Sequence, residues 1–238
     1  MNEPPLDQFF SLQKFAHRAL WKKDEPVWSA LHALKGYLEG AKLGQIQIEI
    51  PANVYLERPE LISIGQGTVI EPGVFIQGPC IIGEHCIIRH GAYLRGDLVV
   101  GNRCVIGHST ELKHSILLDG AAVTHFVYAG DSIIGSGANL GAGVKCANLR
   151  LDRRDVVVRW EKTVFKTKLK KFGAVIGDGV QIGCNCVLNP GTLIGRESVC
   201  HPLLNFGGYV PPQSLVKGKS SLEIEPIGKR ILEQIGKG

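Results

Sequence analysis

The chain has 238 residues, a formal net charge of +5 and a hydrophobic fraction of 44%. This length allows one large or two small domains, and the apolar fraction is sufficient for a buried core. The sequence has no apolar run long enough to cross a bilayer, and its acidic, proline-containing N-terminus is unlike a signal peptide. We therefore expect a cytoplasmic protein without a membrane span. Nucleic acid is not an expected partner, because basic and aromatic residues do not alternate in a stripe.

Residues 1–44 differ in kind from the rest of the chain. Apolar residues recur at helical spacing from Leu6 to Leu20 and again from Val27 to Leu38, with Pro26 between the two runs. This pattern predicts an α-helical hairpin. Because the hairpin is rich in aromatic residues, we expect it to cover the open end of the following repeats or a partner subunit.

An aliphatic residue then returns at every sixth position. A period of six fits neither a helix nor simple strand alternation, but it does fit a parallel β-helix in which each hexapeptide forms a short strand and a corner. The aliphatic residue and the residue two positions before it should both point inward, because side chains alternate along a strand. We predict this all-β solenoid over residues 45–216. The periodic positions are Ile64, Ile70, Ile76, Ile82, Ile88, Leu94, Val100, Ile106, Leu112 and Leu118.

The repeat fails at residues 119–130 and again at residues 147–173. Thr124 occupies the next expected aliphatic position in the first break. The second break is a basic insertion, in which residues 156–158 and 164–165 predict a short hairpin standing off the solenoid. Function is expected at such breaks, because local rules are broken there without a folding benefit. Residues 217–238 form a tail, with a short helix predicted over residues 225–236.

The cysteine and histidine spacings argue against a metal site. Cys184 and Cys186 should face opposite sides of a strand, so they would not share an ion. His90 and His108 are 18 positions apart and should stack, but with His114 they do not match the three-histidine zinc pattern of trimeric hexapeptide-repeat carbonic anhydrases. We expect no metal. The cysteines in inward positions are predicted to be buried free thiols: Cys80, Cys86, Cys104 and Cys186.

His125 is the leading candidate for chemistry, because a neutral imidazole can accept a proton near pH 7. The alternative is a histidine stacked at a coil corner. Arg95 and Lys113 lie 18 positions apart, each directly after an aliphatic residue, so they should stack on one face roughly 4.8 Å apart. Two stacked cations predict an anion between them, with solvated surface charges as the alternative.

The stretch from Ala92 to Gly195 resembles the C-terminal acetyltransferase domain of bifunctional N-acetylglucosamine-1-phosphate uridyltransferases. The resemblance rests on AYLRG (92–96), ELK (111–113), THFVYAGDSIIGSGANLGAG (124–143) and VIGDGVQIGCNCVLNPGTLIG (175–195). The segment ANLRLD (147–152) with the basic insertion that follows is most similar to archaeal-type sugar-1-phosphate nucleotidylyltransferases that carry the same domain.

The resemblance implies a homotrimer of left-handed β-helices with acetyl-CoA as co-substrate between subunits. The acceptor would be the amine of a hexosamine 1-phosphate, in the synthesis of nucleotide-sugar precursors. The roles that it implies are His125 as general base, and Arg95, Lys113 and Tyr128 as ligands of the sugar phosphate.

Four further residues receive roles from the same resemblance. Asn139 would contact the sugar, and Asn148 the amine or the acetyl group. The Ala142 backbone N–H would lie near the thioester oxygen, as an oxyanion-type contact. Cys184 stands near acetyl-CoA, where the family usually has serine.

The sequence also departs from the family. It has no G-x-G-T-R loop of a nucleotidyltransferase domain, so we do not expect it to make a nucleotide sugar. Asn148-Leu149-Arg150-Leu151 stands where bacterial members have Asn-Tyr-Asp-Gly, and Cys200-His201-Pro202 replaces the small residues that flank the cofactor. One alternative is a catalytically degenerate scaffold or partner of a separate nucleotidyltransferase. Another is an acyltransferase whose acceptor is a nucleotide-linked amino sugar.

Overall fold

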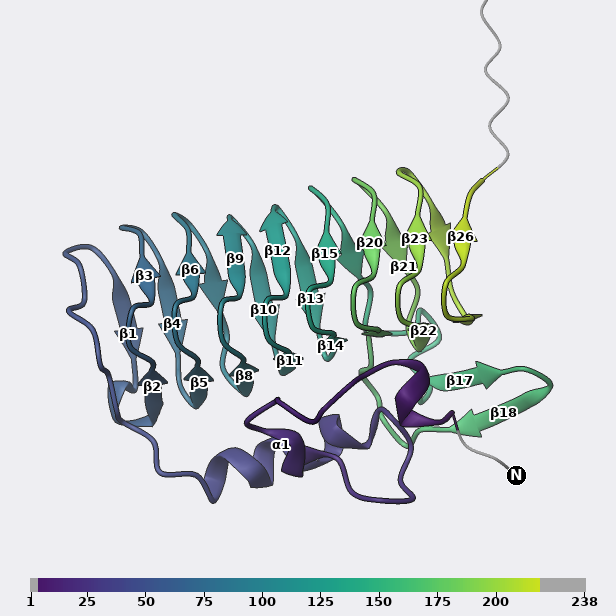
Figure 1. Ribbon diagram of the computed structural model, residues 1–238, viewed down its shortest axis with the longest axis horizontal. Helices are drawn as coiled ribbons and strands as arrows, with labels where there is room; N and C mark the ends of the chain where they lie inside the picture. Colours follow the sequence, from purple (N-terminus) through teal and green to yellow (C-terminus); the bar gives the residue numbers. More distant parts are fainter. Residues whose placement is uncertain (1–3, 219–238) are drawn as a thin grey trace, which may run out of the picture.

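The protein is a three-sided prism of parallel β-strands, seen in a computed structural model that describes residues 4–218 (Figure 1). Each coil contributes one strand to each of three eight-stranded sheets, here called A, B and C. The predicted parallel β-solenoid is therefore confirmed. Its left-handedness stays a prediction.

The strands of each sheet come from successive coils and lie side by side along the prism. Sheet A contains β2 (Ile62–Ile64), β5 (Cys80–Ile82), β8 (Leu98–Val100), β11 (Ser115–Leu117), β14 (Ile133–Ile134), β19 (Ala174–Ile176), β22 (Thr192–Ile194) and β25 (Tyr209–Val210). Sheet B contains β1 (Tyr55–Glu57), β4 (Phe75–Gln77), β7 (Tyr93–Leu94), β10 (Glu111–Lys113), β13 (Tyr128–Gly130), β16 (Lys145–Cys146), β21 (Val187–Leu188) and β24 (Asn205–Phe206). Sheet C contains β3 (Val69–Ile70), β6 (Ile87–Ile88), β9 (Val105–His108), β12 (Ala122–His125), β15 (Asn139–Leu140), β20 (Gln181–Ile182), β23 (Val199–Cys200) and β26 (Leu215–Val216).

The prism interior is a dry column of aliphatic side chains and thiols. The periodic positions from Ile64 to Leu112 all belong to one buried cluster, as predicted. The cysteines predicted to point inward are free thiols with 0% exposure. Burial raises the pKa of the Cys80 thiol to about 12, because the thiolate would lose its hydration.

The predicted register is wrong at Leu118. Tyr93 pairs with Glu111, 18 positions on, whereas Glu111 pairs with Tyr128, 17 positions on. The coil is one residue shorter from this point, so Leu117 enters the prism and Leu118 faces outward into a second cluster. A shift of one residue exchanges the two faces of a strand, which is why the expected positions fail here.

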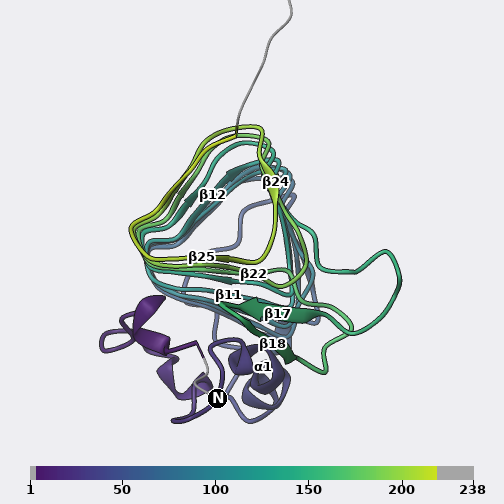
Figure 2. The same cartoon turned by 90° about the vertical axis from the view of Figure 1, so that its right-hand side faces the viewer.

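The second cluster lies between sheet A and the N-terminal segment, so sheet A is buried on both faces. Its outward side chains have 0% exposure: Val99, Ile116, Ile133, Val175 and Leu193. The view along the prism shows the N-terminal segment beneath this side (Figure 2). The segment therefore covers a side of the solenoid and not its open end, because it packs on sheet A; contact with a partner subunit stays a prediction.

The N-terminal segment contains one α-helix, α1 (Ser29–Glu39), rather than a hairpin of two. The first predicted helix is replaced by two 3₁₀ turns, η1 (Leu6–Gln8) and η2 (Arg18–Leu20); a third, η3 (Pro59–Leu61), precedes sheet A. The backbone carbonyls of Gln8 and Phe9 accept hydrogen bonds from Arg196 and Asp178 of the solenoid. These carbonyls are satisfied by the prism, so the segment is held without forming a helix of its own.

The basic insertion forms an antiparallel hairpin of β17 (Val157–Trp160) and β18 (Thr163–Lys166), as predicted. It does not stand off the solenoid. Trp160 packs on Tyr209 of β25 with ring centroids 4.0 Å apart, and Phe165 packs on Trp28. The predicted C-terminal helix lies outside the described residues. Within residues 4–218, no helix has the length and apolar character that crossing a bilayer requires.

Candidate functional site

The corner between sheets C and B carries one column of site candidates. His125 ends β12 and pairs with His108 of the preceding coil. In the following coils, continuing the register of β12, β15 and β20 places Ala142 and then Cys184 at the same position. The carbonyls of His125 and Ala142 accept the N–H groups of Gly143 (2.9 Å) and Asn185 (2.8 Å). Three residues predicted separately from the sequence therefore line one edge of the prism.

The column extends back through a histidine ladder, which the sequence predicted for His90 and His108. Their rings are nearly parallel, with centroids 5.7 Å apart. The Nδ1 atom of His108 lies 2.8 Å from the carbonyl oxygen of His90, so Nδ1 carries the hydrogen. Among the hydrogen bonds of residues 4–218, the half-buried His125 ring has none. Its two nitrogens are therefore available to a ligand.

The Ala142 backbone presents an unused donor beside His125. Gly141 and Gly143 on either side donate to Ile182 (2.8 Å) and His125 (2.9 Å). The Ala142 N–H makes no hydrogen bond to any described residue. Cys184, one coil further, is exposed, whereas Cys186 is buried, so the two thiols face opposite sides as expected.

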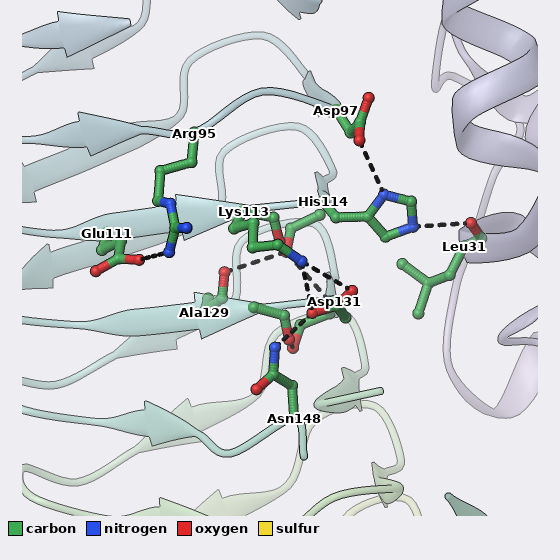
Figure 3. A network of polar contacts seen from close by, with 12 residues as sticks. Leu31, Arg95, Asp97, Glu111, Lys113, His114, Ala129, Asp131 and Asn148 are labelled. Carbon is green, nitrogen blue, oxygen red and sulfur yellow. Dashed lines mark hydrogen bonds and ion pairs between the residues drawn. The ribbon is translucent and has the colours of Figure 1, made fainter. Parts of the chain in front are cut away.

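Arg95 and Lys113 lie in adjacent coils at the corner between sheets B and A, as the spacing predicted. Each already has an anionic partner in the chain. Arg95 contacts Glu111 at 2.6 Å, and Lys113 lies 3.3 Å from Asp131 (Figure 3). The hydrogen bond that Arg95 donates to Glu111 raises the pKa of Arg95. The stacked cations predicted an anion beside them, and the protein's own carboxylates supply at least part of that negative charge.

Tyr128 and Asn148 meet beside the same corner. A Cβ atom built on Gly130 would lie 2.5 Å from the Tyr128 hydroxyl and 2.7 Å from Asn148 Nδ2, so these two polar groups converge there. Asn148 Nδ2 also donates to Asp131 at 2.5 Å. Burial, and secondarily the charge of Asp131, raises the pKa of Tyr128, so its hydroxyl stays protonated as a donor.

Asp97, His114 and Asp131 occupy equivalent positions of successive coils at this corner. Their backbones are left-handed, with φ of 50°, 46° and 49°. His114 Nε2 lies 3.1 Å from the Leu31 carbonyl oxygen of α1, and its Nδ1 lies 3.6 Å from Asp97 (Figure 3). The corner thus joins α1 to the coils that hold Lys113 and Asn148.

Asn139 lies neither in the corner column that contains His125 nor at the corner that holds Arg95 and Lys113. It faces outward from sheet C between the fully buried Ala138 and Leu140, and it pairs with Ala122 and Gln181. Tyr128 and Asn148, in contrast, belong to sheet B and its far corner. One chain therefore presents the predicted sugar ligands on two different sides of the prism.

Sequence reasoning missed two acidic residues. Glu111 and Asp131 were not assigned to the site, yet they pair with Arg95 and Lys113. For Asp131 the available signal was its position in the H-x-x-Y-x-G-D motif, close to residues already selected. A cavity of about 920 Å³ lies elsewhere, between the N-terminal segment and the β17–β18 hairpin. None of the candidate site residues lines this cavity.

A family profile for the GMPPB C-terminal domain matches residues 76–171. A bifunctional protein GlmU from Methanococcus vannielii is 37% identical over 48% of this chain. A bifunctional sugar-1-phosphate nucleotidylyltransferase/acetyltransferase from Sulfurisphaera tokodaii is 37% identical over 38% of it. The aligned parts cover 27% and 22% of those relatives, so this chain spans about a quarter of their length.

Among solved structures, GDP-perosamine N-acetyl transferase from Caulobacter crescentus superposes with a TM-score of 0.33 at 18% identity, covering 80% of this chain and 64% of that one. This likeness is too distant to bear on activity. The uncharacterized acetyltransferase YaiX from Escherichia coli O6:K15:H31 is 31% identical over 87% of this chain and 89% of its own length. The chain therefore belongs to the hexapeptide-repeat acyltransferases, in the family that YaiX represents.

Proposed function

We propose that this protein transfers the acetyl group of acetyl-CoA to the amine of a hexosamine 1-phosphate, with His125 as general base. The observation that carries the proposal is the column of His125, Ala142 and Cys184 along one corner, next to the sheet that holds Tyr128 and ends near Asn148. The name of the Sulfurisphaera tokodaii relative, a sugar-1-phosphate nucleotidylyltransferase/acetyltransferase, supports a sugar phosphate as the acceptor class.

The chemistry follows from the groups available. The amine must be neutral to attack, so its nitrogen lone pair adds to the thioester carbonyl as its proton passes to His125. The developing oxyanion accepts a hydrogen bond from the Ala142 N–H, which is otherwise unused among the described residues. Collapse of the tetrahedral intermediate breaks the C–S bond, and protonated His125 returns the proton to the CoA sulfur. The products are an N-acetylated sugar phosphate and free CoA thiol.

The acceptor phosphate contacts Lys113 and Arg95 while these side chains stay in contact with Asp131 and Glu111. Each cation is half-buried or exposed and already paired, so its charge is partly neutralised before ligand arrives. A phosphate offers several acceptor oxygens and can bind the cations without displacing both pairs. Tyr128, kept protonated by its raised pKa, adds a neutral donor.

A homotrimer completes the site. Asn139 lies on sheet C, away from Tyr128 and Asn148 of the same chain, so a single sugar reaches all three only if a second subunit supplies one of them. Sheet A is covered by the N-terminal segment, which leaves sheets B and C and their shared corner for subunit contact.

The test is release of CoA thiol from acetyl-CoA with glucosamine 1-phosphate or galactosamine 1-phosphate. We expect release in the wild type and a rate lower by a factor of about 10² or more in His125→Ala. Release of CoA thiol only with nucleotide-linked amino sugars would show that these, and not hexosamine 1-phosphates, are the acceptors. No release and no acetyl-CoA binding by calorimetry would overturn the proposal in favour of a scaffold.

A further inference from the structure

Asp131 is a buried carboxylate whose side-chain partners both belong to the candidate site. The residue is 5% exposed, accepts the Asn148 amide at 2.5 Å, and lies 3.3 Å from the Lys113 ammonium. A buried charge is costly unless it is paired and hydrogen-bonded. Asp131 therefore holds both side chains in place through the same carboxylate.

The carboxylate decides which way the Asn148 amide points. An ionised carboxylate can only accept hydrogen bonds, so the amide nitrogen must face Asp131. The Tyr128 hydroxyl contacts the same amide and lies on the same side, next to Gly130. The amide oxygen points away from Asp131 and has no hydrogen-bond donor among residues 4–218 (Figure 3).

We propose that Asp131 is a positioning residue that fixes the Asn148 carbonyl oxygen toward the acceptor amine. This inference rests on the proposed acetyl transfer. The oxygen accepts one N–H of the neutral amine and so aims the nitrogen lone pair at the thioester carbon. A donor in its place would bind that lone pair and block the attack. The same carboxylate limits the charge that Lys113 offers to the acceptor phosphate.

The backbone of Asp131 gives this arrangement a rigid base. Its N–H donates to the Lys113 carbonyl at 2.9 Å, and its carbonyl accepts the Gly173 N–H at 2.8 Å. The Phe172 N–H donates to the Asn148 carbonyl at 2.8 Å. The basic insertion therefore departs from the solenoid after Asn148 and rejoins it at Phe172. Its two ends are hydrogen-bonded to each other beside Asp131. Asn148 is held like a residue of a regular coil.

The first test is Asp131→Asn, which keeps the shape of the side chain but adds donors. Asn148 can then face either way, so we expect kcat to fall about 10- to 100-fold, the scale of a lost orientation. The acceptor KM should stay the same or fall, because Lys113 is released from its ion pair. Asp119→Asn is the matched control, since Asp119 bonds the Asn102 N–H at another corner (2.8 Å). A rise in KM with unchanged kcat would overturn the inference.

The second test asks whether Asp131 acts through Asn148. In an Asn148→Ala background, Asp131→Asn should lower kcat no further. A second fall of the same size would overturn the inference, because it would show an independent role.

The third test does not depend on activity. Crystal structures of Asp131→Asn and Asp119→Asn should show the Asn148 amide turned or disordered in the first and unchanged in the second. An unchanged amide in Asp131→Asn overturns the positioning role. Failure of the wild type to release CoA would overturn the proposed function instead, and the crystallographic result would still decide the role of Asp131.

Discussion

His125 pairs directly with His108 across β9 and β12, so two imidazoles occupy equivalent corners of adjacent coils. Among the contacts of residues 4–218, only the His108 ring is tied to the backbone, because its Nδ1 faces the His90 carbonyl at 2.8 Å. His125→Ala should lower kcat by a factor of about 10² to 10⁴, the usual contribution of a general base. Its Tm should not change, because the ring makes no hydrogen bond to the described residues. Initial rates of CoA thiol release measure the effect.

His108→Ala is the control for that experiment. It removes a stacked imidazole from the same column but leaves the proposed base in place, so it should retain most of the wild-type kcat. Equal losses in both variants would show that the ladder matters as a structure and that His125 has no separate chemical role.

Cys184 is exposed, whereas the other cysteines are buried. Burial raises the pKa of Cys80 and Cys146 to about 12, so these thiols stay protonated and unreactive at pH 8. The native protein should therefore react with a disulfide reagent at one thiol per chain, and Cys184→Ser should abolish that reaction. Bound acetyl-CoA should slow the labelling of Cys184 if the cofactor lies along the corner that holds His125, Ala142 and Cys184. Labelling at the same rate with and without acetyl-CoA would remove Cys184 from the proposed path.

Asp97 makes the stability of the contact between α1 and the solenoid depend on pH. The hydrogen bond to His114 holds the pKa of Asp97 below its ordinary value, against the opposing effect of burial. Because the folded state favours the ionised form, this contribution is present above the unfolded pKa of about 3.9 and is lost as the pH falls through the lower folded value. Asp97→Asn should lower Tm at pH 5.5, and the difference from wild type should shrink at pH 3. Asp24→Asn, at an exposed position, should show no such dependence.

Leu34 reports on how much α1 contributes to stability. The side chain is 0% exposed between α1 and sheet A. Leu34→Ala should destabilise the protein by about 2–5 kcal/mol, from lost transfer free energy and the cavity left behind. Lys35→Ala is the neighbouring control, because its contact with Glu39 is long (3.9 Å) and exposed. Equal denaturation midpoints for the two variants would mean that α1 is not part of the cooperative unit.

The sequence was sufficient to predict the solenoid because its period of six excludes the other regular structures. It could not locate the one-residue shortening, since Ile116, Leu117 and Leu118 are all apolar and either register buries a suitable side chain. The N-terminal segment shows the same ambiguity. Its apolar spacing fits a helix, but its backbone carbonyls are satisfied by the solenoid, which no local pattern encodes.

The candidate site was predictable where it depends on stacking. The spacing of Arg95 and Lys113 predicted neighbouring cations, and the structure confirms that they are neighbours. Their carboxylate partners required the exact register of the coils, because Asp131 reaches Lys113 only after the coil has lost one residue. The separation of Asn139 from Tyr128 depends on the same register.

The left-handed corners at Asp97, His114 and Asp131 set stability against activity. A residue other than glycine in this conformation costs about 1 kcal/mol or more. At His114, glycine would relieve this strain, but it would also remove the imidazole that joins α1 to Asp97. At Asp131, glycine would relieve strain in the same way but would remove the carboxylate that holds Asn148, so a variant selected there for heat resistance alone is expected to be a poor catalyst.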